Sequence, residues 1–230
     1  MAFNRDIMPP PRGSESELTA AMAGIGMNFA AQPAPDANIE DTLIHASEAG
    51  MLTDDLRTLS VLTHWLGTHG RYVNADRLTR VVAAHPSERV QVFWKAIAVW
   101  LGVDRRFRRL AGIGVAPGDL LAVGTDFHLS RRGPDPRFEN GPLRVPLGTL
   151  RERDSDVMSP HDLSRLHRGY RNRVQMGPSW RADIWTILET EPGLSVSEVS
   201  RRAYCGFATA WSTVQDFNLL RGNPAAPRVA

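Results

Sequence analysis

Side chains that can hydrogen-bond to phosphates and to the edges of bases gather near the C-terminus of this sequence. Arg201 and Arg202 are adjacent, and a group of short polar residues follows: Thr209, Ser212, Thr213 and Gln215. Arginine pairs with phosphate through charge-assisted hydrogen bonds, whereas hydroxyl and amide groups can reach base edges. If one surface presents them together, these residue types predict contacts with a nucleic-acid duplex.

The spacing of apolar residues and caps predicts three helices that would position these side chains. Ser179 caps the first helix, and Ser195 caps a second, short one, with Glu198 at the capping-box spacing. A turn at 205–207 leads into a third helix over 208–220. Trp211 is expected near the outward edge of the third helix, where it faces either the duplex or a second copy of the chain.

This pattern over Ser195 to Leu220 resembles the winged helix-turn-helix of bacterial regulators of the MarR and ArsR type. The stretch RNRVQMGPSWRADIWTIL, from Arg171 to Leu188, is similar to the lead-in helix of antitoxin-type regulators. The resemblance implies that the third helix reads double-stranded DNA and that Arg201 and Arg202 contact its backbone. Tyr204 stands where such turns usually carry glycine, and the residues after 220 are too few and too proline-rich for a full wing.

A basic segment precedes the three helices. Ser159 followed by Pro160 predicts a helix start, and the resulting helix over 160–173 is the most basic in the chain. Its arginines, Arg168 and Arg171 among them, are expected to displace counterions from DNA. Residues 1–100, by contrast, carry 8 Lys and Arg against 11 Asp and Glu. The predominance of arginine over lysine can equally reflect a GC-rich genome.

The rest of the chain predicts a mainly α fold. Residues 1–36 have no sustained periodicity and are expected to form a disordered arm. Residues 37–114 predict a small helical bundle that starts with a helix from Asn38 ending at Gly50. Residues 115–158 predict an irregular connector with short strands, among them 120–123, and one hairpin; residues 159–230 form the helix-turn-helix domain.

Several classes of function find no support in the sequence. Cys205 is the only cysteine, so an internal disulfide is impossible and a reducing, cytoplasmic setting is expected. No apolar run reaches the roughly 18 residues of a membrane span. Phosphate-loop, dinucleotide-binding and nucleophile-elbow motifs are absent, and the histidine spacings do not fit zinc patterns. We therefore expect no catalytic residue, no cofactor and no metal site.

Two hypotheses follow. The first is a DNA-binding transcriptional regulator or antitoxin-like protein, in which the N-terminal helices mediate homodimerisation or bind a protein partner. The second is a helical adaptor for protein interactions that does not bind DNA, because three helices with this patterning also serve as plain interaction modules.

Overall fold

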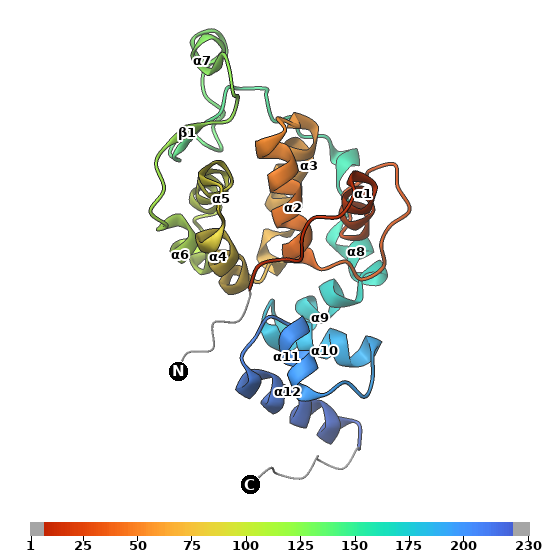
Figure 1. Ribbon diagram of the computed structural model, residues 1–230. Helices are drawn as coiled ribbons and strands as arrows, with labels where there is room; N and C mark the ends of the chain where they lie inside the picture. Colours follow the sequence, from red (N-terminus) through yellow and green to blue (C-terminus); the bar gives the residue numbers. More distant parts are fainter. Residues whose placement is uncertain (1–6, 223–230) are drawn as a thin grey trace.

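The computed structural model describes residues 7–222, which are mainly helical (Figure 1). Residues 1–6 of the expected arm and residues 223–230 of the expected last domain lie outside the described residues. Short 3₁₀ turns occur at Gly70–Tyr72, Arg105–Phe107 and Asp154–Asp156. The other elements are α1 (Glu15–Gly24), α2 (Ile39–Leu52), α3 (Leu56–His69), α4 (Ala75–Ala84), α5 (Glu88–Trp100), α6 (Arg108–Ala111), β1 (Gly118–Asp119), α7 (Thr125–Arg132), β2 (Leu143–Arg144), α8 (Pro160–Leu166), α9 (Arg168–Met176), α10 (Trp180–Thr190), α11 (Val196–Arg202) and α12 (Phe207–Leu220).

The larger of two apolar cores is built on α2, α3 and α5. Trp65 and Trp94 lie fully buried in it. The indole N–H of Trp65 donates to the carbonyl of Ile25 at 2.8 Å, and that of Trp94 donates to the hydroxyl of Ser47 at 2.9 Å. The expected helix end at Gly50 is wrong, because α2 continues to Leu52. Gly50 instead lets α2 and α3 approach closely, since an added Cβ would lie 2.3 Å from the side chain of Leu59.

The expectation of a disordered arm over 1–36 is wrong for the described part of it. Ser14 caps α1, and Leu18, Met22, Ile25 and Met27 are buried in the larger core. Their partners come from far along the chain: Met27 forms an antiparallel bridge with Val157, and Met158 N–H donates to Gly26. The composition of residues 1–36 therefore did not reveal that contacts with distant residues order the described part of this segment.

The segment 115–158 also belongs to the larger core and does not form a separate connector. Leu120, Phe138, Leu143, Val145 and Leu150 are all buried in it. The expected hairpin is replaced by a parallel pairing of β1 with β2, and the expected strand over 120–123 is absent. The helix α7, which the sequence analysis did not predict, lies between the two strands along the chain.

The basic helix expected over 160–173 is two helices. Ser159 caps α8 as predicted, but the helix is interrupted at His167. The His167 imidazole accepts a hydrogen bond from the Tyr170 N–H at 2.9 Å and so caps α9. Leu163 and Tyr170 pack into the larger core. The expected domain boundary at 158/159 is therefore displaced towards α10, where the second core begins.

The C-terminal unit, α10 to α12, has a core of its own (Figure 1). Ile184, Val199, Ala210 and Val214 are buried between the three helices. Trp185 packs edge-on against Phe217, with ring centroids 4.9 Å apart. Among the helices of residues 7–222, none combines the length and the apolar character needed to span a bilayer.

Candidate nucleic-acid interface

Four residues, 203–206, connect α11 to α12, and Tyr204 gives this turn its shape. Tyr204 has φ 53°, the left-handed conformation that a residue with a Cβ adopts only when its surroundings hold it. Its hydroxyl donates to Asp41 at 3.0 Å, and the Arg77 guanidinium lies 3.8 Å from the centre of its ring. Burial raises the pKa of Tyr204 to about 12, and Asp41 acts in the same direction, so the phenol remains a donor.

A buried ion network joins the C-terminal unit to the larger unit. Arg173 donates to both carboxylate oxygens of Glu40, each at 2.7 Å, and to Asp183 at 2.7 Å. Burial alone would lower the pKa of Arg173, but the carboxylates of Asp183 and Glu40 outweigh it and hold that pKa above its ordinary value. The side chain of Arg173 is 3% exposed. The expectation that the arginines of this segment contact DNA is therefore wrong for Arg173, which is structural.

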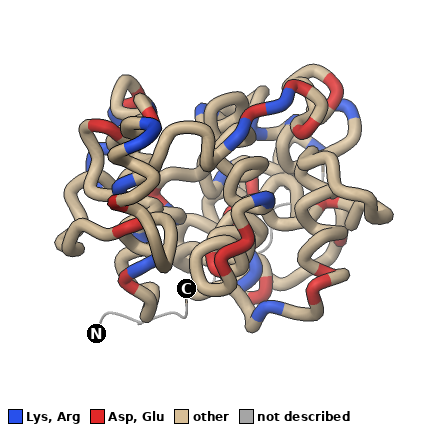
Figure 2. The backbone as a smooth tube through the Cα atoms, turned by 90° about the horizontal axis from the view of Figure 1, so that it is seen from above, with Lys and Arg blue, Asp and Glu red and all other residues tan. Residues whose placement is uncertain are grey.

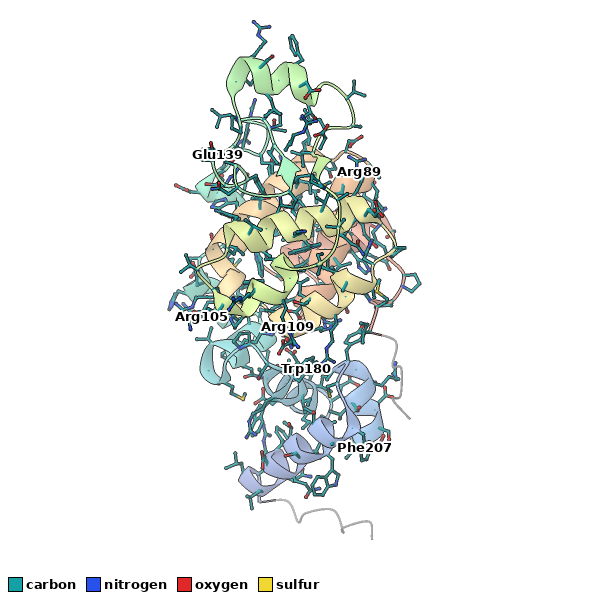
Figure 3. All side chains as sticks on the ribbon, turned by 90° about the vertical axis from the view of Figure 1, so that its left-hand side faces the viewer. Arg89, Arg105, Arg109, Glu139, Trp180 and Phe207 are labelled. Atoms are coloured by element: carbon teal, nitrogen blue, oxygen red, sulfur yellow. The ribbon has the colours of Figure 1, made fainter. Side chains whose placement is uncertain are left out.

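The network continues into α4 and α10. Asn74 caps α4 and donates its amide N–H to Asp183 at 3.2 Å, while its backbone N–H donates to Glu40 at 2.9 Å. Arg80 of α4 lies 4.9 Å from the ring centre of Trp180, and Trp180 is near the boundary between the units in Figure 3. Polar contacts therefore fix the C-terminal unit on the larger unit.

The first half of α12 presents several side chains to solvent. Phe207 is 48% exposed and Trp211 is 41% exposed, and Thr209 and Ser212 are exposed beside them. Phe207 points away from the rest of the unit in Figure 3. The residue before α12 is Gly206, which has no side chain to cap the first backbone N–H groups, so they remain available to an anion.

Thr213 does not belong to this face. Its side chain is 4% exposed, and its hydroxyl donates to the carbonyl of Thr209 at 2.9 Å. The expectation that it points outwards is wrong because position 213 lies on the inner side of α12 with Ala210 and Phe217. Gln215 is half-buried, and within residues 7–222 its side-chain nitrogen has no hydrogen-bond partner.

Arg201 and Arg202 lie at the surface of α11 and are paired with acidic neighbours. Glu198 accepts from Arg201 Nε at 3.0 Å and from Arg202 Nε at 2.7 Å, and Arg202 also pairs with Glu191. These hydrogen bonds lower the pKa of Glu198 to about 2. The Arg201 side chain is 71% exposed. Exposed ion pairs of this kind contribute little to stability, so a phosphate can replace the carboxylate.

The remaining candidates, Arg168 and Arg171, lie on α9. The guanidinium of Arg168 donates to Thr190 at 3.2 Å, and its backbone N–H donates to Asp36 at 2.8 Å. Arg171 is exposed and makes no ion pair within residues 7–222. The helix that carries these two arginines, α9, packs on α10. Arg168 and Arg171 are therefore not part of the exposed face of α12.

Comparison with protein-family models, with curated proteins and with solved structures found no match. Nor do residues 7–222 place three histidine, cysteine or acidic side chains where they could hold a metal ion. The contacts of Tyr204 with Asp41 and Arg77 were not predicted from the sequence. The substitution of tyrosine for the usual turn glycine was the available signal, since such a residue needs partners that stabilise it.

Proposed function

We propose that α11 and α12 dock on double-stranded DNA and that the protein is a DNA-binding regulator. The observation that carries the proposal is the exposed first half of α12, which follows a short helix and a four-residue turn and offers Thr209 and Ser212 beside uncapped backbone N–H groups. A helix presented in this way can enter the major groove, with its N-terminal residues closest to the bases.

The arginines near this face could exchange their carboxylate partners for phosphates of DNA. Arg201 and Arg202 are held by Glu198 and Glu191 in the free protein, and both arginines lie on the helix that precedes α12. Approach of a phosphate would replace these carboxylates as the partner of each guanidinium. Binding would then depend strongly on salt, because the displaced counterions of DNA favour dissociation as the salt concentration rises.

The test is selection of duplexes from a random library with the full chain, followed by fluorescence anisotropy on the selected duplex. The double variant Arg201→Gln/Arg202→Gln should weaken binding at least tenfold and reduce the slope of log affinity against log salt by about 2. The matched control is Arg105→Gln/Arg108→Gln, which removes two exposed arginines from the larger unit. Equal weakening by both double variants, or no enrichment of any duplex, would contradict the proposal.

A second candidate function, docking of a protein partner on α12, is favoured by one specific observation. The exposed Phe207 and Trp211 lie four residues apart on α12, which carries no lysine or arginine. Aromatic side chains on an exposed face are typical of the centres of protein interfaces. In sedimentation experiments, concentration-dependent self-association that Trp211→Ser abolishes would support a homodimer through this face.

A further inference from the structure

A hollow in the larger unit lies between α3, α7 and the segment 148–156. Its volume is about 490 Å³, within the range of pockets that hold small molecules. In Figure 1, α7 and α12 lie at opposite ends of the molecule, so this cavity is separate from the candidate nucleic-acid interface. Its residues are Leu56, Arg57, Ser60, Val61, Leu121, His128, Arg132, Gly148, Thr149, Arg151, Arg153 and Asp156.

The cavity is strongly basic. Four arginines and one histidine line it, against the single carboxylate of Asp156. None of the four arginines makes an ion pair with another residue in the range 7–222. Arg57 lies 5.5 Å from the ring centre of Phe29. Like charges gathered around one hollow repel each other, and an anion would relieve that repulsion.

Two of the acidic residues close to the cavity form ion pairs with arginines that do not line it. Glu152, which stands between Arg151 and Arg153 in the sequence, pairs with Arg137 at 2.5 Å. Asp126 of α7 pairs with Arg144 at 2.7 Å. Figure 2, which views the molecule from the α7 end, shows positions of basic and acidic residues interleaved along the backbone. Because Glu152 and Asp126 pair with Arg137 and Arg144, neither carboxylate forms an ion pair with an arginine of the cavity.

Hydrogen bonds fix the wall that carries Arg151 and Arg153. The Arg151 backbone N–H donates to the Ser60 hydroxyl of α3 at 3.2 Å. On the other side, Asn28 donates its backbone N–H to the Asp156 carbonyl at 2.9 Å and its amide N–H to the Ser155 carbonyl at 2.6 Å. The segment is therefore held between α3 and the N-terminal residues, and the two arginines project from an anchored backbone.

We propose that this cavity binds a small phosphate-bearing ligand of nucleotide size, with two or more phosphates. The guanidinium groups of Arg57, Arg132, Arg151 and Arg153 match the geometry of phosphate oxygens and would hold the charged end. The uncharged part of the ligand would lie against Leu56, Val61 and Leu121, with the hydroxyl of Thr149 available for orientation. A nucleoside polyphosphate has this combination of an anionic end and a flat, less polar end.

The experiment is isothermal titration calorimetry of the full chain with ATP, GTP, inorganic pyrophosphate and adenosine. We expect at least one nucleoside triphosphate to bind at least tenfold more tightly than pyrophosphate, and adenosine not to bind. Arg132→Gln and Arg153→Gln should each weaken that affinity about tenfold, since each removes a charge-assisted pair. The matched control is Arg131→Gln, which removes the neighbouring exposed arginine of α7 that does not line the cavity.

Three outcomes would overturn this proposal. The first is equal weakening by Arg131→Gln and Arg132→Gln, which indicates non-specific attraction, and the second is no binding of any triphosphate at millimolar concentration. The third is binding of a single-stranded oligonucleotide that depends on Arg132 while no triphosphate binds, which assigns the surface to nucleic acid. Duplex binding through α12 is measured separately on Arg132→Gln and should be unchanged, so failure of one proposal does not imply failure of the other.

Discussion

The same residue types form ion pairs in two regions of this molecule with opposite consequences. At the junction between the units, Arg173 is almost fully buried between Glu40 and Asp183. On α11, Arg201 and Arg202 pair with Glu198 at the surface. A buried pair cannot exchange its partner without leaving a charge in the interior, whereas an exposed pair can. Burial therefore decides which arginines hold the fold and which can bind a ligand.

The largest expected effect comes from breaking the junction. Arg173→Met should lower the free energy of unfolding by about 3–5 kcal/mol, because Glu40 would stay buried with only Arg77, at 3.4 Å, as a cationic partner and Asp183 would lose its ion pair. Urea denaturation followed by circular dichroism measures the change. Arg171→Met is the matched control: it removes an exposed arginine from the same helix and should change the free energy by less than about 0.5 kcal/mol.

If the two variants had the same stability, the distinction between buried and exposed pairs would not hold for this protein. Loss of cooperativity in Arg173→Met, with the two units unfolding at different urea concentrations, would also be informative. It would show that the network couples the units, whose apolar cores are two separate clusters.

The second prediction concerns acid and the histidines beside the junction. Burial lowers the pKa of His69 from 6.5 to about 4, and burial also lowers the pKa of His167. Below pH 6.5 the unfolded chain takes up a proton at His69 that the folded chain does not accept. Stability should therefore fall as the pH decreases, by about 2 kcal/mol for His69 between pH 7.5 and pH 5.

Urea denaturation at a series of pH values from 7.5 to 5 checks this, a window that lies above the ordinary pKa of carboxyl groups. His69 Nε2–H donates to the Met158 carbonyl at 3.0 Å, so Nδ1 of the neutral ring accepts from the Tyr170 hydroxyl at 2.8 Å. His69→Gln keeps a polar side chain there and should flatten the pH dependence. A slope unchanged in this variant would mean that His69 is not the group that takes up the proton.

The sequence predicted the C-terminal unit better than the larger one. The contacts of α10, α11 and α12 are local, so helical periodicity and the cap at Ser195 show where the helices begin. Ser179 does precede α10, but the prediction that it caps this helix is wrong, since its side chain makes no capping hydrogen bond within residues 7–222. The arm and the connector were misread because their order depends on distant partners. Asn28, for example, bonds to Ser155, 127 positions away, and no local pattern reports such a contact.

The candidate site was also predictable only in part. Spacing alone placed Thr209 and Ser212 correctly at the surface but misplaced Thr213, because one helix position separates the outer face from the inner one. Composition could not separate Arg173 from Arg171, which are two residues apart in the same basic segment. Only the tertiary arrangement shows that one meets Glu40 and that the other meets solvent.

The smallest expected effect concerns the exposed ion pairs of Arg201 and Arg202 on α11. Glu198→Gln removes the shared carboxylate partner of Arg201 and Arg202, so the guanidinium of Arg201 becomes available to phosphate and Arg202 keeps only its pair with Glu191. We expect the affinity for the selected duplex to rise about fivefold, with a steeper dependence on salt, because the surface gains positive charge. The midpoint of thermal unfolding should change by no more than about 2 °C, since exposed pairs contribute little.

Glu139→Gln is the control for this prediction, because Glu139 is an exposed carboxylate of the larger unit and lies far from α12 in Figure 3. It adds the same net charge at a place that should not contact the duplex, so its affinity should stay close to that of the parent. Equal gains in both variants would indicate a general charge effect. Weaker binding in Glu198→Gln would show that the carboxylate orients the two arginines, and the α11 pairs would then be structural like those of the junction.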